Sequence, residues 1–269
     1  PAKAVVKLGV PLIAGMFIMV LYNLVDTYFI GLMRDDYQLA AVNLAYPVMM
    51  VMIAISNMIG AGASSLIARS LGAGDNMKAA HTLTAGFVLT VVNSVIVTAA
   101  GLLLLPQIVS GLGAQNNTFD YTSQYVLVLF IGSIFTMGSY TAGQLLRAEG
   151  SVKQSIAGMI AGTITNIVLD PIMIYGLLGV PEMGVKGAAY ATVIGQIVSF
   201  AVAFIFHLKV NTAITNKLRY LKPDLRIIGQ MYAVGLPAII SQALISVMTY
   251  GMNLVLGGIA GEAVTAYGL

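Results

Sequence analysis

Long apolar runs separated by short polar segments dominate this chain. Seven runs reach the roughly 20 mainly apolar residues that a helix needs to cross the hydrocarbon core of a bilayer. They cover about residues 8–32, 40–68, 83–105, 122–145, 155–179, 187–207 and 229–257. None of them shows the ten-residue alternation that is typical of a transmembrane barrel. The pattern therefore predicts an all-α integral membrane protein.

Composition supports this fold class. Hydrophobic residues make up 58% of the 269 positions and charged residues only 9%, whereas about a quarter of the residues in soluble domains are charged. The first run is not a cleavable signal peptide, because it is too long and Asp26 interrupts it. The chain has no cysteine, so its sequence gives no information on redox compartment.

The basic residues are distributed unevenly about the predicted spans. If the amino terminus is cytoplasmic, eleven of the thirteen fall on the cytoplasmic side, and only Arg34 and Lys186 fall outside. The eleven are Lys3, Lys7, Arg69, Lys78, Arg147, Lys153, Lys209, Lys217, Arg219, Lys222 and Arg226. This bias predicts a multi-pass topology with a cytoplasmic amino terminus. It also explains the basic pI without nucleic acid, since no basic face is interleaved with aromatic residues.

The most polar connection, residues 207–229, indicates a boundary between two halves. After it, residues 235–257 align without gaps with residues 9–31. The aligned identities are Gly9 with Gly235, Pro11 with Pro237, Ile13 with Ile239 and Gly31 with Gly257. We expect a parallel repeat related by an axis along the membrane normal, although chance similarity between two apolar helices is the alternative. The expected units are a six-helix amino-terminal lobe (1–208), a cytoplasmic linker (209–228) and the first helix of a second lobe (229–269), which would continue beyond Leu269.

Two carboxylates, Asp26 and Asp170, interrupt the first and fifth apolar runs. A charged side chain at the bilayer centre costs about 2.5–3.5 kcal/mol on insertion scales, so such residues usually face a polar cavity and mark an ion or substrate path. Asn23 lies three residues before Asp26 on the same helical face, with Tyr22 beside it. The alternative is that Asp26 is a helix-end residue close to the external headgroups.

The fifth run carries the clearest polar constellation. Thr163, Asn166 and Asp170 follow i, i+3, i+7 spacing, which places them along one helical face. Pro171 removes the donor that would bond the carbonyl of Ile167, so four oxygen-bearing groups could converge on a cation. A proton would need only the carboxylates, since burial favours their neutral form. The spacing does not separate these two coupling ions, and a purely structural brace of a proline-kinked helix is the alternative.

Other intramembrane residues are candidates for a substrate cavity. Met50 belongs to a methionine-rich second run that could form an adaptable lining, although methionine is more often apolar filler. Tyr46 and Tyr140 could contact a cationic substrate through their rings, or anchor helices at the interface. Asn43, whose carbonyl Pro47 would free, adds a polar group to the second run. His81 and His207 are expected to be solvated at the cytoplasmic boundary, without the spacing of a metal site.

These residues resemble a known family. NIVLDPIMIYG at 166–176 and MGVKGAAYATVIGQ at 183–196 are similar to the fifth and sixth helices of multidrug and toxic compound extrusion (MATE) transporters. Pro11, Asp26 and Gly31 form a P-x14-D-x4-G pattern that resembles the family's first helix. RSLGAGD at 69–75 and LLRAEG at 145–150 resemble its cytoplasmic loops. The wording YNLVDTYFIG at 22–31 is closest to the bacterial DinF-like or MepA-like branch.

The resemblance implies a twelve-helix transporter of the bacterial plasma (inner) membrane, with two six-helix lobes around a central cavity. It would export organic, often cationic, drugs in exchange for Na⁺ or H⁺. The family's cation site falls here on Asp26, Asn166, Asp170 and Thr192. Substrate-cavity candidates are Tyr22, Asn23, Asn43, Tyr46, Met50, Tyr140 and Thr163. No cofactor, no metal beyond a coupling Na⁺ and a monomeric state are expected.

Three alternative functions stay open at this point. A lipid-linked glycan flippase of the same superfamily would need a cationic cavity, and the predicted spans carry carboxylates instead. An ion channel would conduct downhill without alternating access. A membrane enzyme would need a nucleophile next to a base, but the chain has no cysteine and both histidines lie away from the candidate carboxylates.

Overall fold

The computed structural model describes residues 28–29, 31–32, 35–115, 117–210 and 224–257. In chain order the described elements are α2 (Asp36–Gly72), α3 (Asn76–Leu103), α4 (Leu105–Gly111), α5 (Asn117–Ile131), α6 (Ser133–Ala148), α7 (Val152–Tyr175), a 3₁₀ turn η1 (Leu177–Gly179), α8 (Val185–Val210) and α9 (Leu225–Gly257). No strand occurs in these ranges. The predicted all-α class is confirmed for this part of the chain.

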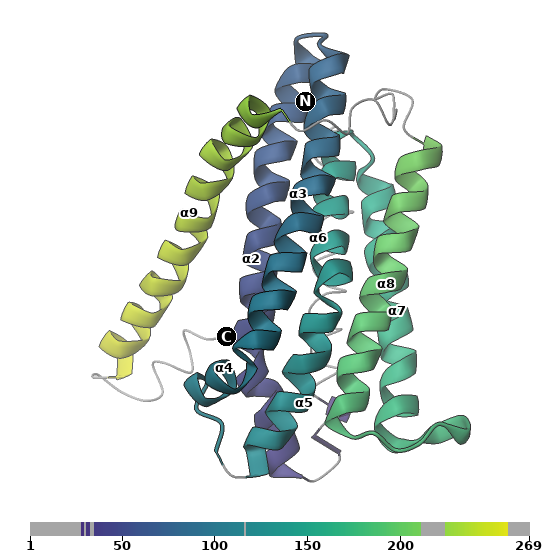
Figure 1. Ribbon diagram of the computed structural model, residues 1–269, viewed down its shortest axis with the longest axis vertical. Coiled ribbons are helices and arrows are strands. Elements are labelled where there is room, and N and C mark those ends of the chain that lie inside the picture. Colours follow the sequence, from purple (N-terminus) through teal and green to yellow (C-terminus); the bar gives the residue numbers. More distant parts are fainter. Residues whose placement is uncertain (1–27, 30, 33–34, 116, 211–223, 258–269) are drawn as a thin grey trace.

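The long helices stand side by side as an antiparallel bundle, and α9 leans away from it (Figure 1). Among the described residues, α2, α3, α7 and α8 are each long and apolar enough to cross a membrane. The pair α5 and α6 provides a fifth span if both helices cross together. The predicted multi-pass membrane fold is thus confirmed, while the first predicted run, 8–32, lies almost entirely outside the described residues.

Local sequence signals set several helix ends. Oδ1 of Asp35 accepts a hydrogen bond of 3.0 Å from the Tyr37 amide at the start of α2. At the start of α3, Oδ1 of Asp75 accepts one of 2.9 Å from the Lys78 amide. These caps satisfy backbone donors that the first helical turn leaves free. α7 ends at Tyr175 because Gly176 adopts the left-handed conformation (φ 70°), so the predicted run 155–179 ended four residues too late.

The predicted single span at 122–145 is broken in the structure. α5 and α6 meet at Gly132 with a bend of 55°. A side chain at Gly132 would collide with Val193 of α8, so the glycine allows α8 to approach at the bend. Thr98 Oγ1 of α3 donates a 2.8 Å hydrogen bond to the Phe130 carbonyl. A neighbouring helix therefore satisfies a carbonyl beside the break, as an apolar environment requires.

The α7–α8 interface is built on glycines from both helices. A Cβ on Gly162 would lie 2.5 Å from the carbonyl oxygen of Gly195, and a Cβ on Gly195 would lie 2.8 Å from the carbonyl oxygen of Gly162. Towards the other end, a Cβ on Gly187 would collide with the Met173 carbonyl. Small residues let membrane helices approach closely enough for van der Waals contact along their backbones. The two helices are therefore held tightly together over several turns.

α9 meets α2 at a single crossing. Side chains at Gly62 of α2 and at Gly235 of α9 would collide with the carbonyls of Met231 and Met58, respectively. Asn93 Nδ2 of α3 also donates a 3.3 Å hydrogen bond to Tyr232 Oη of α9. Beyond this region α9 diverges from α2 towards the opposite end of the bundle (Figure 1). Contact with the bundle is thus concentrated near the start of α9.

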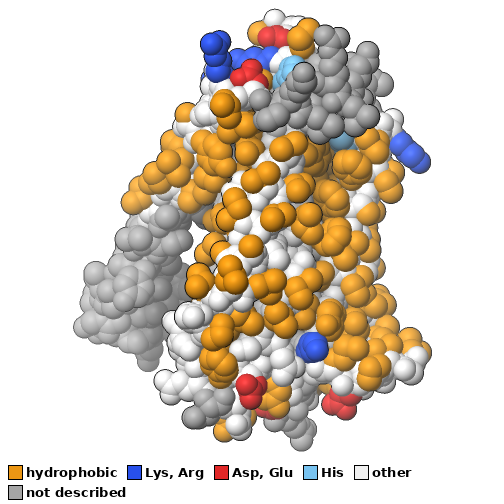
Figure 2. Space-filling model, in the orientation of Figure 1, with side chains coloured by type: hydrophobic (Ala, Val, Ile, Leu, Met, Phe, Trp, Pro, Cys, Tyr) orange, Lys and Arg blue, Asp and Glu red, His pale blue; other side chains and the backbone are white. Residues whose placement is uncertain are grey.

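One end of the bundle collects most of the described basic residues (Figure 2). They lie where α2, α6 and α8 end and where α3, α7 and α9 begin: Arg69, Lys78, Arg147, Lys153, Lys209 and Arg226. Lys186, in the first turn of α8, lies at the opposite end. We call these two ends the basic end and the distal end.

His207 at the basic end is not solvated, so that prediction was wrong. Nδ1 lies 3.1 Å from Oε1 of Glu149, and the two side chains are 4% and 0% exposed. The rings of Phe87 and Phe204 flank the imidazole, with centroids 5.5 and 6.5 Å away. Glu149 follows α6 and His207 lies in the last turn of α8, so the pair joins two helix ends.

Candidate functional site

Asn166 and Asp170 form a buried polar pair on α7. Nδ2 of Asn166 donates a 3.1 Å hydrogen bond to Oδ1 of Asp170. The two residues are 2% and 0% exposed. The bond spans one helical turn, as the i, i+4 spacing predicts. The amide oxygen of Asn166 is also buried and accepts no hydrogen bond from a described residue. It is therefore a candidate ligand for a cation.

α8 covers this part of α7. A Cβ on Gly195 would lie 3.1 Å from Cβ of Asn166, so the absence of a side chain there lets the two helices close over the polar pair. Thr192 lies one turn before Gly195 on α8 and is 2% exposed. The hydroxyl that the family resemblance assigned to the cation site is thus buried on the helix that packs against Asn166. Thr163 is half-buried on α7, one turn before Asn166.

The end of the first apolar run is attached to the end of α7. Tyr175 Oη donates a 2.6 Å hydrogen bond to the Phe29 carbonyl. Phe29 lies three residues after Asp26 in the chain, and Tyr175 lies five residues after Asp170. This bond links the segments that follow the two predicted acids. Asp26, Tyr22 and Asn23 themselves lie outside the described residues.

Two polar features near the site were not predicted from the sequence. Tyr125 of α5 is buried in the cluster that contains Ile174 of α7 and Ala188 and Ala189 of α8. Ile174 lies one turn after Asp170 on α7. The only signal in the sequence was a tyrosine inside an apolar run, which more often indicates an interface anchor.

A second unpredicted feature is a short hydrogen bond of 2.5 Å from Ser139 Oγ of α6 to Gln196 Oε1 of α8. Gln196 lies one turn after Thr192, so α8 carries a second polar group on the face that bears Thr192. Interhelical hydrogen bonds of this kind hold membrane helices in register. The bond therefore fixes α8 against α6 close to the candidate cation site.

The predicted cavity residues of α2 share one face. Asn43 and Tyr46 are exposed and Met50 is half-buried, while Ala45 and Val48 pack inside the bundle. Tyr140 of α6, the other tyrosine candidate, is half-buried. Positions 43, 46 and 50 follow i, i+3, i+7 spacing, so they form one stripe. This stripe stays a prediction for a substrate surface.

The described side chains of the candidate site offer oxygen ligands. Among the described residues, no group of three or more histidine, aspartate and glutamate side chains could hold a metal ion. The described groups at the site are one carboxylate, one amide and one hydroxyl, on Asp170, Asn166 and Thr192. Such oxygen ligands favour hard cations.

Comparison with known proteins supports the resemblance seen in the motifs. The family model MatE matches residues 11–172. The multidrug export protein MepA of Staphylococcus saprophyticus is 31% identical over 267 residues, which cover 99% of this chain and 58% of that protein. MepA of Staphylococcus aureus is 29% identical over the same share of each.

Solved structures match along the same length. The crystal structure of a MATE protein in the bent conformation superposes with a TM-score of 0.87 at 32% identity, covering 99% of this chain and 59% of that one. An outward-facing multidrug resistance MATE family transporter of the MOP superfamily gives a TM-score of 0.85 at 33% identity, covering 97% and 57%.

The chain therefore spans less than three fifths of the length of these relatives. The match to the MatE family model includes the α7 segment with Asn166 and Asp170. The MepA relatives and the solved structures extend the similarity over nearly the whole chain. The family expected from the motifs is thus confirmed: the chain belongs to the MatE family of multidrug and toxic compound extrusion proteins.

Proposed function

We propose that the intact protein is a multidrug efflux antiporter that exports organic cations in exchange for Na⁺ or H⁺ by alternating access. The MepA relatives are multidrug export proteins by name, and the matched structures include a multidrug resistance transporter. The observation that carries the coupling mechanism is the Asn166–Asp170 pair, which is buried inside an apolar helix. Burying a carboxylate in a bilayer is costly and is retained mainly where it serves transport.

The proposed coupling site consists of Asp170, Asn166, Thr192 and Asp26. Asn166 holds one carboxylate oxygen of Asp170 and offers its own amide oxygen to the incoming ion. The bond between Tyr175 and the Phe29 carbonyl supports bringing Asp26 to the same site, because it links the chain segments just after the two acids. A Na⁺ ion would use these oxygens as ligands, and a proton would neutralise one of the carboxylates.

Coupling requires that the ion bind the two access states with different affinity. Occupancy of the site would alter how the first apolar run packs on α7, because Asp26 of that run and Asp170 of α7 would bind the same ion. A change there would reshape the substrate surface on α2, where Asn43, Tyr46 and Met50 form one stripe. Ion binding would then promote drug release, so that the bound ion and the bound drug exclude each other.

We further propose that the basic end faces the cytoplasm of a bacterial inner membrane. Six described lysine and arginine residues at that end against one at the distal end agree with the positive-inside rule. The amino terminus is then cytoplasmic, and α9 begins a second lobe that completes the cavity. Membrane lipid and small-molecule drugs are the expected partners of a monomeric transporter.

Efflux of a fluorescent organic cation from cells that express the intact protein tests this proposal under imposed Na⁺ or H⁺ gradients. Asp170→Asn and Asp26→Asn should each abolish gradient-driven efflux. Asp120→Asn is the matched control, since Asp120 is an exposed acid in the first turn of α5. Normal efflux in both site variants would remove these acids from the mechanism. The gradient that drives wild-type efflux identifies the coupling ion.

A further inference from the structure

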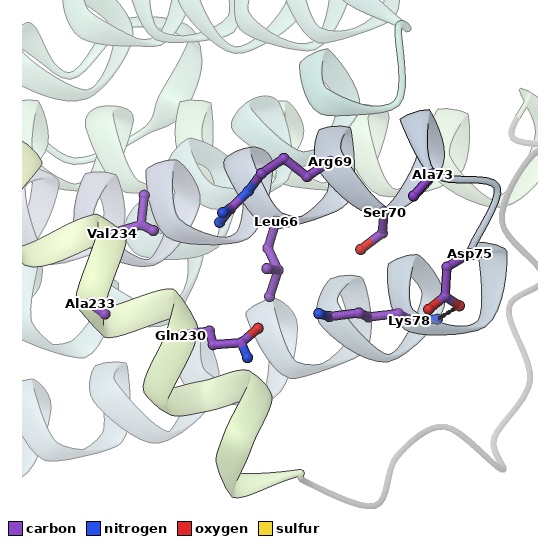
Figure 3. Close-up of a pocket in the computed structure, with 9 residues that line it drawn as sticks. All are labelled: Leu66, Arg69, Ser70, Ala73, Asp75, Lys78, Gln230, Ala233 and Val234. Atoms are coloured by element: carbon purple, nitrogen blue, oxygen red, sulfur yellow. Dashed lines mark hydrogen bonds between the residues drawn. The ribbon is translucent and has the colours of Figure 1, made fainter.

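A pocket of about 560 Å³ opens at the basic end, between the α2–α3 hairpin and the start of α9 (Figure 3). Its lining comes from three helices: Leu66, Arg69, Ser70 and Ala73 of α2 and its cap, Asp75 and Lys78 at the start of α3, and Gln230, Ala233 and Val234 of α9. The side chains of Lys78 and Gln230 point towards each other across the opening, and Ser70 projects into it (Figure 3). The pocket thus combines two cations, a hydroxyl and an amide with an apolar wall.

Arg69 and Lys78 bring two positive charges to the pocket. Among the described residues, neither Arg69 nor Lys78 has a carboxylate within ion-pair distance. Nε of Arg69 donates a 3.3 Å hydrogen bond to the Ser65 carbonyl, which leaves the outer guanidinium nitrogens for another acceptor. One oxygen of Asp75 is used to cap α3. Two positive charges against one negative charge give the pocket a net attraction for anions.

The length of α2 would carry the pocket to the depth of the lipid headgroups. α2 has 37 residues, which at 1.5 Å per residue make about 55 Å, so it extends well past the roughly 30 Å hydrocarbon core. Arg69 lies in the last turn of α2, beyond the apolar part of the span. Leu66 of α2 and Ala233 and Val234 of α9 line the same pocket, about one turn nearer the middle of their helices than Arg69 and Gln230. An amphiphile could therefore place its charged group on the cations and its apolar part against these residues.

We propose that this pocket binds the phosphate group of an anionic phospholipid. Arg69 and Lys78 would hold the phosphate oxygens, Ser70 and Gln230 would donate hydrogen bonds, and Leu66, Ala233 and Val234 would contact the glycerol and upper acyl chain. Basic pockets between membrane helices bind anionic headgroups through this combination of charge and apolar contact. The lipid would bridge α3 and α9 beside the Gly62–Gly235 crossing and so stabilise their contact.

The test measures retention of phosphatidylglycerol by the full-length protein in native mass spectrometry, after transfer from phosphatidylglycerol–phosphatidylcholine nanodiscs. Each basic residue near an anionic headgroup contributes about fivefold in affinity. The double variant Arg69→Gln/Lys78→Gln should bind phosphatidylglycerol about 25-fold more weakly and lose one retained lipid. Arg69→Lys/Lys78→Arg, which keeps both charges, should retain the lipid and report on folding.

Lys153→Gln/Lys209→Gln is the matched control, because it removes two charges from the same end outside the pocket. It should keep the lipid. Equal loss in this control would mean that diffuse surface charge binds the lipid and would overturn the proposal, as would full retention by the pocket variant. A competition experiment with inorganic phosphate distinguishes a lipid site from a site for a soluble anion. Displacement of phosphatidylglycerol by millimolar phosphate would indicate a site for a soluble anion and would also overturn the lipid assignment.

Discussion

The α7–α8 interface and the α2–α9 crossing both depend on glycines, but they differ in extent. On α7 and α8 the close approaches run from Gly158, where a Cβ would lie 3.2 Å from the Ser199 carbonyl oxygen, through Gly162 and Gly195 to Gly187. On α2 and α9 they are confined to Gly62 and Gly235 at one crossing. The first interface follows both helices for most of their length, and the second touches at one place.

This difference indicates separate mechanical roles. Backbones in contact over many turns have few ways to slide without collision, so α7 and α8 should move as one body and keep Asn166, Asp170 and Thr192 in fixed relation. A single crossing leaves the angle between two helices free to change while the contact is kept. We therefore expect the candidate ion site to be rigid and the α2–α9 crossing to be the joint about which the lobes rotate.

The largest effect is expected from Gly162→Val. The added side chain would collide with the Gly195 carbonyl oxygen and with Ser199, and neither backbone can withdraw without separating the helices. Overpacking usually costs about 1–3 kcal/mol, and a backbone collision should reach or exceed the upper value. We expect most of the protein to be lost, as measured by size-exclusion profiles during heating. Gly229→Val, at a position with nothing within 4 Å, should leave the profile nearly unchanged.

A chemical bridge between α3 and α9 should abolish transport without unfolding the protein. Asn93→Cys/Tyr232→Cys places thiols where these side chains now share a hydrogen bond. The length of tyrosine makes the gap too wide for a direct disulfide, so a short bismaleimide is required. Residues 1–269 contain no cysteine, so within this part of the protein only the two introduced thiols react. Efflux by the bridged protein at the uncrosslinked rate would show that α9 need not move from α3.

Gly235→Ala should affect transport more than stability. Its methyl group would push α9 away from the Met58 carbonyl by roughly an ångström. α9 can yield, since it crosses α2 only once, so the thermal midpoint should fall less than in Gly162→Val. Efflux should drop severalfold because the joint no longer closes. Gly229→Ala controls for helix propensity on α9. A stability loss as large as that of Gly162→Val would remove the distinction between the two interfaces.

The smallest effect is expected from Tyr232→Phe, which removes the hydroxyl that binds Asn93 and keeps the ring. Interhelical hydrogen bonds in membranes contribute about 0.6 kcal/mol on average. Denaturant titration should therefore detect a slight loss of stability, with efflux close to that of the parent. A loss above about 2 kcal/mol would exceed the largest such values and would mean that this bond, not the glycine crossing, holds α9.

The sequence predicts well what depends on local periodicity. Apolar runs indicate the spans because a bilayer fixes their length, and the i, i+4 spacing of Asn166 and Asp170 places them within hydrogen-bonding reach on one helix. The distance of 3.1 Å between them agrees with this expectation. The family motif adds Thr192, which lies buried on the adjacent helix, and its part in the cation site stays a prediction. Each of these inferences needs only one helix or one motif.

What depends on contacts between distant segments was not predicted. In the sequence, Gly132 is one glycine inside an apolar run. The bend there depends on residues of other helices: Thr98 binds the Phe130 carbonyl, and Val193 packs against Gly132. His207 was expected in solvent because it ends a span. Its partner Glu149 lies 58 positions earlier, and only the packing of α6 against α8 brings the two together. Periodicity carries no information about such pairs.

Because α9 crosses α2 only once, a small tilt at the crossing moves its far end by a large distance. From Gly235 to Gly257 the helix continues for 22 residues, or about 33 Å at 1.5 Å per residue. A tilt of about 10° around the crossing would therefore sweep its far end by about 6 Å, on the scale of one helical turn. A small change of angle at the crossing therefore becomes a wide excursion at the distal end of α9.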